Sequence, residues 1–320
     1  MNWTRKDLID IESLSAEEIR TLLACARQFK QVCLSPRKHA PFLQGYTVIN
    51  FFVEPSTRTR TSFELAAKHL GATVVNLSAE GSSLKKGETL KDTVRNLESL
   101  QADVLIIRHS ASGAPQFVAE RVRSSVVNGG DGAHAHPTQA FLDAFTMIEK
   151  RGTLEGAHVT ILGDILYSRV ARSNIWLLNK MGAKVTLCGP PTLVPKNFEK
   201  MGCRVTHHIE DAIDDADFVN LLRIQHERQR KSAFPSLGEY TAFFGLTKER
   251  VKLMKPNAII MHPGPINRGV EIDSDIADCE RSVVLHQVTN GLAVRMAALY
   301  LVTGNSPDDL EKNLEPYIQH

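Results

Sequence analysis

The sequence predicts an α/β fold of two tandem domains, each an open, mainly parallel sheet flanked by helices. Its 320 residues suit two domains of ordinary size. Short apolar segments alternate with helical patterns of roughly 10 to 15 residues, which is typical of parallel βαβ units. This alternation stops at a long helical pattern over 137–150 and then begins again, so the chain should contain two such sheets.

The first run of the alternation begins with a helix. Ser15 and Glu18 have the spacing of a capping box, and apolar residues follow at helical intervals, so this helix should start near Ala16. Two more helices are expected at 59–70 and 89–100. Strands are expected around them, at 46–52, 73–77, 103–107 and 125–128.

The second run follows the helix at 137–150. One helix should span 168–181, where Gly182 stops it, and a final helix should span 287–302. The strands of this run are expected at 158–162, 184–188, 218–222 and 258–261.

We expect one domain to comprise 1–136 and 290–320 and the other to comprise 137–289. Ligands of open parallel sheets bind outside the carboxyl ends of the strands, so functional residues should directly follow strands. The stretch 225–245 reads as a loop long enough to be functional or mobile.

The charge balance excludes several classes of function. Lys and Arg number 38 against 36 Asp and Glu, so a net charge of +2 does not indicate a generic nucleic-acid surface. No apolar run approaches the roughly 20 residues of a membrane span. The N-terminus lacks the apolar core of a secretory signal. We therefore expect a cytoplasmic protein without nucleic-acid or membrane partners.

The cysteines and histidines indicate neither a disulfide framework nor a metal site. The five cysteines are scattered, odd in number and without a CxxC pair, so buried thiols are expected. His134 and His136, and also His207 and His208, lack acidic or thiolate partners at ligand spacing. We expect no metal and no cofactor.

A candidate anion site directly follows the first strand. It runs over 54–61 and leads into a helix, whose N-terminus offers unpaired N–H groups and a partial positive charge. Ser and Thr are ordinary caps there, but Arg58 and Arg60 in the first turn are unfavourable beside the helix dipole. A bound anion would compensate them, so this segment predicts a phosphate site.

Seven short sequence motifs, taken together, indicate a family. The motifs are Ser-Thr-Arg-Thr-Arg at 56–60, Lys-Gly-Glu-Thr-Leu at 86–90, Ile-Arg-His at 107–109, Gly-Asp-Gly at 130–132 with His-Pro-Thr-Gln at 136–139, Gly-Asp at 163–164, Leu-Arg-Ile-Gln at 222–225 and His-Pro-Gly-Pro at 262–265. In this order they resemble the aspartate and ornithine carbamoyltransferases over about residues 7–303. The Lys before Gly-Glu-Thr and the Arg-x-Gln resemble the aspartate branch. The His-Cys-Leu-Pro and Ser-Met-Gly motifs of ornithine enzymes do not occur.

The resemblance implies transfer of the carbamoyl group of carbamoyl phosphate to the amine of L-aspartate, an early step of pyrimidine synthesis. Carbamoyl phosphate has a good leaving group, so orientation, a polarised carbonyl and a stabilised phosphate suffice without metal or covalent nucleophile. The first domain would bind carbamoyl phosphate and the second would bind aspartate.

The resemblance also assigns the carbamoyl-phosphate residues. The phosphate should be held by Ser56, Thr57, Arg58 and Thr59. The carbonyl oxygen should face Arg108, Thr59 and His136, and Gln139 should bind the carbamoyl NH₂. With Pro137 at the first helical position, the helix N-terminus would keep the His136 imidazole neutral and suited to donating a hydrogen bond.

Aspartate carries two carboxylates, which planar arginine donors suit. Arg169 and Arg223 both follow strands, as the sheet rule requires, and the resemblance assigns them to aspartate. Gln225 is a further candidate. The loop with Pro263 and Gly264 would offer carbonyls to the aspartate ammonium, with the last proline bond cis.

The resemblance further implies a homotrimer with shared sites, in which a loop reaches the neighbouring subunit. Lys86 is the expected donor, although Lys85 stays open, and the accompanying hydroxyl is Ser82 or Ser83. Taken without the resemblance, a solvated loop lysine would be the better interpretation. A regulatory chain or a dihydroorotase as partner stays open.

Domain closure is the last implied feature. Glu54 should bridge to Arg169 and Arg228 when both substrates are bound; the alternative is a local counter-ion for Arg58 or Arg60. Leu166 departs from the family, which commonly has a basic residue there, and this puts closure contacts or affinity in doubt.

Three other functions are less well supported by the sequence. A non-catalytic structural partner would have no physical reason to keep such a set of cations. Transfer of the carbamoyl group to ornithine or a diamine stays an open alternative. An oxidoreductase is a poor alternative, because the Gly-Asp at 163–164 lacks the G-x-G-x-x-G spacing.

Overall fold

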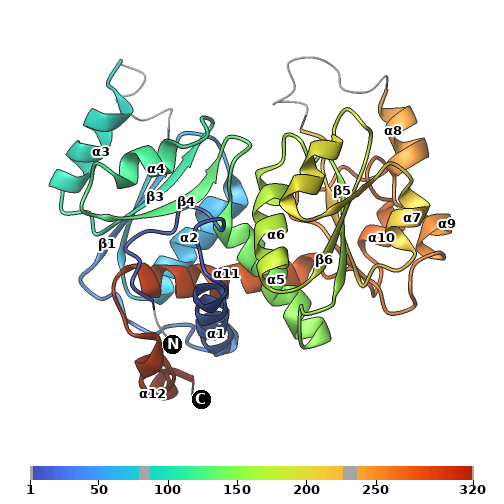
Figure 1. The fold of residues 1–320 in the computed structure, drawn as a ribbon. Helices are drawn as coiled ribbons and strands as arrows, with labels where there is room; N and C mark the ends of the chain where they lie inside the picture. The colour runs from blue at the N-terminus through green and yellow to red at the C-terminus, as the bar shows by residue number, and fades with distance from the viewer. Residues whose placement is uncertain (1–2, 79–86, 226–235, 319–320) are drawn as a thin grey trace. The chain divides into compact units, whose positions relative to one another are not determined.

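A computed structural model describes residues 3–78, 87–225 and 236–318. The chain forms two compact units, Met1–Leu142 with Thr289–His320, and Asp143–Val288 (Figure 1). Each unit holds a parallel sheet with flanking helices, which confirms the predicted fold class. The assignment of domains at 1–136 with 290–320 and at 137–289 stays a prediction.

The sheet of the first unit has the strand order β2-β1-β3-β4, with parallel pairing throughout. The strands are β1 (Thr47–Phe52), β2 (Thr73–Ser78), β3 (Val104–His109) and β4 (Ser125–Asp131). The helices are α1 (Ala16–Leu34), α2 (Thr57–His69), α3 (Leu90–Ser99), α4 (Ala114–Ala119), α12 (Pro307–Ile318), the start of α5 (Pro137–Arg151) and most of α11 (Val284–Val302).

The first unit is held together by apolar residues that lie between the sheet and its helices. The predicted capping box of α1 is present, because Ser15 and Glu18 bond each other's backbone N–H groups. One core cluster packs α3 and α4 on a face of the sheet through Ile49, Leu105 and Val118, among others (Figure 1). The central strands, β1 and β3, are buried over most of their length, as expected of a parallel sheet covered on both faces.

The sheet of the second unit has the order β7-β6-β5-β8-β9 and is also parallel. Its strands are β5 (His158–Gly163), β6 (Lys184–Cys188), β7 (Arg204–Thr206), β8 (Phe218–Leu222) and β9 (Ile259–Met261). Its helices are α6 (Arg169–Lys180), the 3₁₀ helix η3 (Lys196–Met201), α7 (Ile209–Ile213), α8 (Leu237–Phe244), α9 (Lys248–Val251) and α10 (Ser274–Ala277).

The expected loop at 225–245 needs a correction. Its last part forms α8, where the Ser236 hydroxyl accepts the N–H of Glu239 as a cap, while 226–235 lie outside the described residues. The other elements absent from the expectation are the short ones, α4, η3, β7, α7, α9 and α10, and the terminal α12. Elements of three to six residues are too short to carry a periodic signal.

The five cysteines are free thiols, and all but Cys279 are buried, which confirms the interpretation as buried thiols. Burial raises the pKa of Cys25, Cys33 and Cys188 to about 12, so these thiols are inert.

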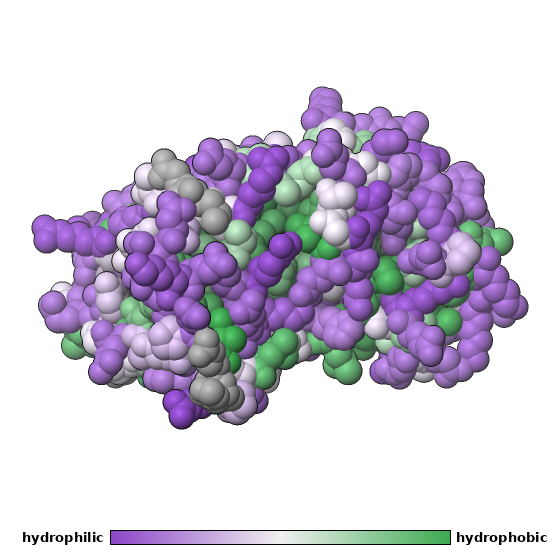
Figure 2. All heavy atoms as spheres, turned by 90° about the horizontal axis from the view of Figure 1, so that it is seen from below, coloured by the Kyte–Doolittle hydropathy of each residue, from purple (hydrophilic) through white to green (hydrophobic). Residues whose placement is uncertain are grey.

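On the face that Figure 2 shows, hydrophilic residues dominate, with smaller apolar areas among them. Among the described helices, none combines the length and the apolar character that crossing a membrane would need.

Candidate active site

The strand order places the candidate site of the first unit. The order β2-β1-β3-β4 reverses its direction of winding between β1 and β3, and open α/β sheets bind ligands at such a switch point, beyond the carboxyl ends of the strands. Glu54 and the start of α2 follow β1. Arg108 is the second-last residue of β3 and pairs with Phe52 of β1. The two groups predicted from distant motifs therefore meet at one edge of the sheet.

The N-terminus of α2 has the features of an anion site. Ser56 is the N-cap residue, and among the described residues its hydroxyl makes no capping bond to the helix. The first turn holds no acidic residue, and Thr57 and Arg58 are exposed while Thr59 is buried. Backbone N–H groups, hydroxyls and a guanidinium thus surround the helix end, where a phosphate is favoured.

Arg108 links the two strands at this edge. Its Nη2 donates to Oε1 of Glu54 at 2.7 Å, and its Nη1 donates to the carbonyl of Gly129 at 3.1 Å. Its backbone carbonyl accepts the N–H of Val53 at 2.9 Å. Glu54 is thus a counter-ion of Arg108 in the structure. Its predicted role in domain closure stays a prediction.

His136 lies directly before α5, and its carbonyl accepts the N–H of Gln139 at 3.0 Å. Both side chains are buried. The loop before them is shaped by Asp131, a fully buried carboxylate that accepts the N–H groups of Gly113 and Ala135 and the amide of Asn128. Asp131 was not among the predicted site residues. An acidic residue at the end of a buried strand was the available signal.

His134 stabilises the same loop in a pH-dependent way. Its Nδ1 lies 3.0 Å from Oδ2 of Asp131, and this hydrogen bond raises the pKa of His134 above its ordinary 6.5, although partial burial opposes the shift. A raised folded-state pKa gives stability that is fully present below the unfolded pKa and is lost as the pH rises through the folded pKa.

We therefore expect His134→Asn to lower the free energy of unfolding near about pH 5.5 and to leave it almost unchanged near about pH 8. The difference should stay below about 1 kcal/mol, because the side chain is 39% exposed and water screens the pair. Denaturant titrations at the two pH values measure it. An equal loss at both would show that the charged pair is not the cause.

The second unit repeats the arrangement. The order β7-β6-β5-β8-β9 reverses between β5 and β8, and Arg169 and Arg223 lie in the segments that follow those strands. Gly163 ends β5 with a φ of +132°, and a Cβ there would collide with the carbonyl of Leu222, so only glycine permits this close approach.

A buried aspartate joins these two segments. Asp164 accepts the N–H of Tyr167 through Oδ1 at 3.1 Å and the N–H of Gln225 through Oδ2 at 3.0 Å. Arg169 begins α6 and is buried, while Arg223 is partly exposed and donates to the carbonyl of Ile224 at 3.3 Å. The carboxylate thus fixes the spacing of the segments that carry the two arginines.

The loop after β9 is tied down by a buried histidine. The N–H of Gly264 donates to Nδ1 of His262 at 2.8 Å, so the ring proton lies on Nε2, which donates to Oε1 of Glu271 at 3.0 Å. The Gly264–Pro265 bond is cis, as the resemblance implies. Glu271 was not predicted, because only the fold brings it to His262.

The structure thus places the predicted residues in two groups, one in each unit. The first contains Glu54, Ser56, Thr57, Arg58, Thr59, Arg108, His136 and Gln139, and the second contains Arg169, Arg223, Gln225, Pro263 and Gly264. Lys86 and its alternatives Lys85, Ser82 and Ser83 lie outside the described residues, as does Arg228. Within the described ranges, no three His, Cys, Asp or Glu residues gather as a metal site.

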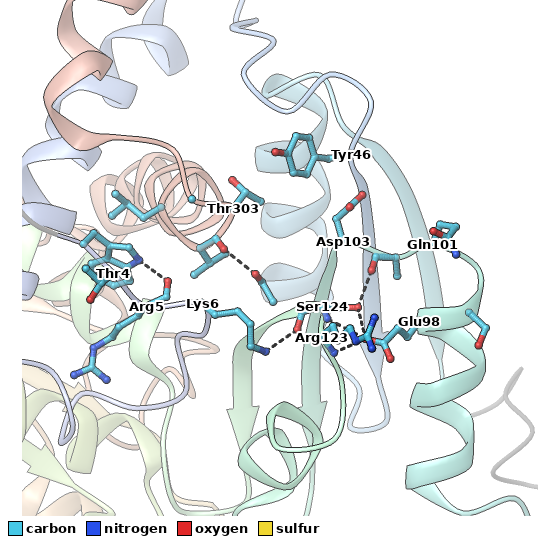
Figure 3. A pocket seen from close by; sticks show the side chains of 17 residues that line it. Thr4, Arg5, Lys6, Tyr46, Glu98, Gln101, Asp103, Arg123, Ser124 and Thr303 are labelled. Atoms are coloured by element: carbon cyan, nitrogen blue, oxygen red, sulfur yellow. Dashed lines mark hydrogen bonds between the residues drawn. The ribbon is translucent and has the colours of Figure 1, made fainter.

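A cavity of about 890 Å³ lies away from this site. It lies at the opposite edge of the first sheet, where Tyr46 and Asp103 precede β1 and β3 (Figure 3). Its polar groups bond one another: Lys6 donates to the carbonyl of Ser124 at 3.0 Å, and the Ser124 N–H donates to Glu98 at 3.0 Å. The cavity therefore presents satisfied polar groups rather than converging donors.

Both parts of the chain match domains of one known protein family. Residues 6–149 match the carbamoyl-phosphate-binding domain of the aspartate/ornithine carbamoyltransferases, and residues 155–302 match their aspartate/ornithine-binding domain. The aspartate carbamoyltransferase catalytic subunit of Opitutus terrae is 56% identical over 97% of this chain and 99% of its own length. That of Syntrophus aciditrophicus is 55% identical over 96% of this chain and all of its own.

Solved structures give the same result. Aspartate transcarbamoylase from Trypanosoma cruzi, in complex with carbamoyl phosphate and aspartate, has a TM-score of 0.82 and 30% identity over 92% of this chain and 96% of its own. Ornithine carbamoyltransferase from Pyrococcus furiosus has a TM-score of 0.84 and 32% identity over 96% of this chain and all of its own.

Proposed function

The chain belongs to the aspartate/ornithine carbamoyltransferase family, and we propose that it transfers the carbamoyl group of carbamoyl phosphate to the amine of L-aspartate. The products are N-carbamoyl-L-aspartate and phosphate, in de novo pyrimidine synthesis. The observation that carries the proposal is the pair of switch points. One presents a helix N-terminus with arginines for a phosphate, and the other presents two arginines for a dicarboxylate.

The first unit would activate the donor. Phosphate oxygens accept N–H and O–H groups from the start of α2 and the guanidinium of Arg58. Arg108, Thr59 and His136 donate to the carbonyl oxygen, where negative charge develops as the amine adds to the carbon. The carbon–oxygen bond to phosphate then breaks, and the phosphate takes the proton that the amine loses. Gln139 holds the carbamoyl NH₂.

The second unit would orient the acceptor. Arg169 and Arg223 bind the two carboxylates of aspartate, and Gln225 adds a hydrogen bond. The carbonyls of Pro263 and Gly264 accept from the aspartate nitrogen before it attacks. Orientation of this kind turns a bimolecular reaction into a nearly unimolecular one.

Aspartate is favoured over ornithine by the donor set. Ornithine carries one carboxylate and a side-chain amine, so it would leave one of two arginines without an anion. Eight relatives at 50% to 56% identity are aspartate carbamoyltransferase catalytic subunits.

The test is a carbamoyl-transfer assay with aspartate, ornithine and putrescine. Carbamoylation of aspartate alone supports the proposal. Carbamoylation of either amine in preference to aspartate would reassign the substrate, and no transfer at all would support a structural role.

We also propose a cytoplasmic homotrimer in which Lys86 completes the site of a neighbouring subunit. β2 is an edge strand of the first sheet, and it leaves Val75 38% exposed, with Leu65 of α2 42% exposed. Apolar side chains beside an unpaired strand edge suit coverage by a second protein surface. A regulatory chain or dihydroorotase as further partner stays open.

Mixing two inactive chains tests the shared site. In a cyclic trimer of Lys86→Ala and Arg58→Ala chains, one interface of each mixed trimer combines both intact residues. Random reassembly at equal amounts should therefore restore about a quarter of wild-type activity, since about three quarters of trimers are mixed and each has one complete site. Activity after denaturation and refolding of the mixture measures this. A mixture as inactive as its parents would contradict sharing.

A further inference from the structure

A buried carboxylate in the second unit has no part in the reaction described so far. Asp143 lies on α5 and is fully buried. Its Oδ2 accepts the side-chain amides of Asn174 at 2.8 Å and Asn220 at 3.3 Å, and its Oδ1 accepts the amide of Gln287 at 2.8 Å. A buried carboxylate is costly unless it is hydrogen-bonded, and these three amides satisfy it.

Each of these partners connects Asp143 to a segment that carries a proposed aspartate-binding group. Asn174 lies on α6, and its amide also donates to the carbonyl of Val170, beside Arg169, at 3.1 Å. Asn220 lies on β8, three residues before Arg223.

The third partner reaches the loop after β9. Gln287, on α11, accepts the backbone N–H of His262 through Oε1 at 3.0 Å. His262 directly precedes Pro263 and Gly264, so one carboxylate is connected to all three groups of donors and acceptors.

We propose that Asp143 is a positioning residue for the aspartate site: its carboxylate, through Asn174, Asn220 and Gln287, sets the relative positions of Arg169, Arg223 and the Pro263–Gly264 carbonyls. The inference rests on the proposed function. Asp143 touches no substrate in this scheme; it acts through the three amides. Asp143 and its three amide partners lie in one unit and are almost entirely buried. A change at Asp143 should therefore displace its partners, because these buried side chains are out of reach of bulk water that could replace the lost bonds.

The direction of the bonds gives a sharp test. Asp143→Asn turns one acceptor into a donor, so an NH₂ group faces either Gln287 or the two asparagines. Gln287→Glu places a second carboxylate against Asp143. In the double variant the amide of the new asparagine donates to the new glutamate, whose oxygens still accept the His262 N–H. Every bond described above is then restored, with the negative charge at position 287 instead of position 143.

Kinetics on the intact enzyme distinguish positioning from mere stability. Each single variant should raise the KM for aspartate about tenfold or more, because small misplacements of binding groups are costly, and should leave carbamoyl-phosphate affinity within about twofold. The double variant should return the KM to within about threefold of wild type. A role limited to stability would lower the melting temperature and the active fraction, and hence kcat, at unchanged KM.

The possible results each decide the matter. An unchanged KM in both single variants, or a double variant no better than the worse single one, overturns the proposal. If neither single variant folds, Gln287→Met deletes two of the bonds without adding a charge, and an unchanged KM there also overturns it. A wild-type enzyme that does not carbamoylate aspartate refutes the proposed function instead, whereas an active wild type with unaffected variants refutes only the role of Asp143.

Discussion

Replacing Arg108 by alanine should lower kcat by about 100- to 1,000-fold, the usual cost of removing a donor aimed at a developing oxyanion. Arg108 is held by Glu54 and by the Gly129 carbonyl, with its side chain only 12% exposed, so the guanidinium is preorganised. A donor already in place needs no reorganisation as charge develops on the carbonyl oxygen. The measurement is kcat with both substrates saturating.

Two further variants isolate the cause of that loss. Arg95→Ala removes an exposed arginine of α3 in the same unit and should leave kcat unchanged. Arg108→Ala combined with Glu54→Gln also removes the carboxylate that loses its Arg108 partner in the single variant, and we expect no recovery of kcat. Recovery in this double variant would mean that the stranded charge, and not a lost catalytic donor, caused the effect.

Changing Arg223 to lysine should lower kcat/KM for aspartate by roughly 100-fold, although the charge is kept. A lysine presents a point charge and cannot make the two parallel bonds of a guanidinium fork. The lost charge-assisted bond is worth about 1.5 to 3 kcal/mol, or roughly 10- to 150-fold, before any loss of orientation.

The control for this change is Arg204→Lys, at an exposed position of β7 in the same unit. It should have wild-type kinetics. Calorimetry should also show unchanged carbamoyl-phosphate affinity in Arg223→Lys. If instead aspartate kinetics are normal and carbamoyl-phosphate affinity falls, Arg223 belongs to the other substrate.

The fold class followed from local patterns that are strong on their own. Buried parallel strands read as continuous apolar runs, as in Val104 to Ile107, and the capping box of Ser15 and Glu18 marked the start of α1 to the residue. The prediction of a loop at 225–245 was wrong at α8, because this helix has only eight residues and its sequence shows no clear helical periodicity of apolar side chains. Its cap, Ser236 with Glu239, was the signal that could have found it.

The candidate site likewise contains residues that the sequence predicts and residues that only the structure reveals. Arg58, Arg108, Arg169 and Arg223 could be predicted from the family motifs together with their positions, because each lies at the end of a strand, after a strand or at the start of a helix. The residues that hold them were not predictable. Asp143 meets Asn174, Asn220 and Gln287 across 31, 77 and 144 residues of sequence, and Glu271 meets His262 only where the loop after β9 folds back.

The sequence by itself determined which chemical groups stand at the ends of the strands, since alternation and motif order are local properties of the chain. Only the tertiary structure decided which buried polar side chains satisfy one another. Whether an Asp on one helix faces an amide on another depends on how the helices pack against the sheet, and a polar residue in an apolar stretch looks the same in sequence whether or not it has a partner. Asp143 is such a residue, and its significance came from the three elements, α6, β8 and α11, whose amides converge on it.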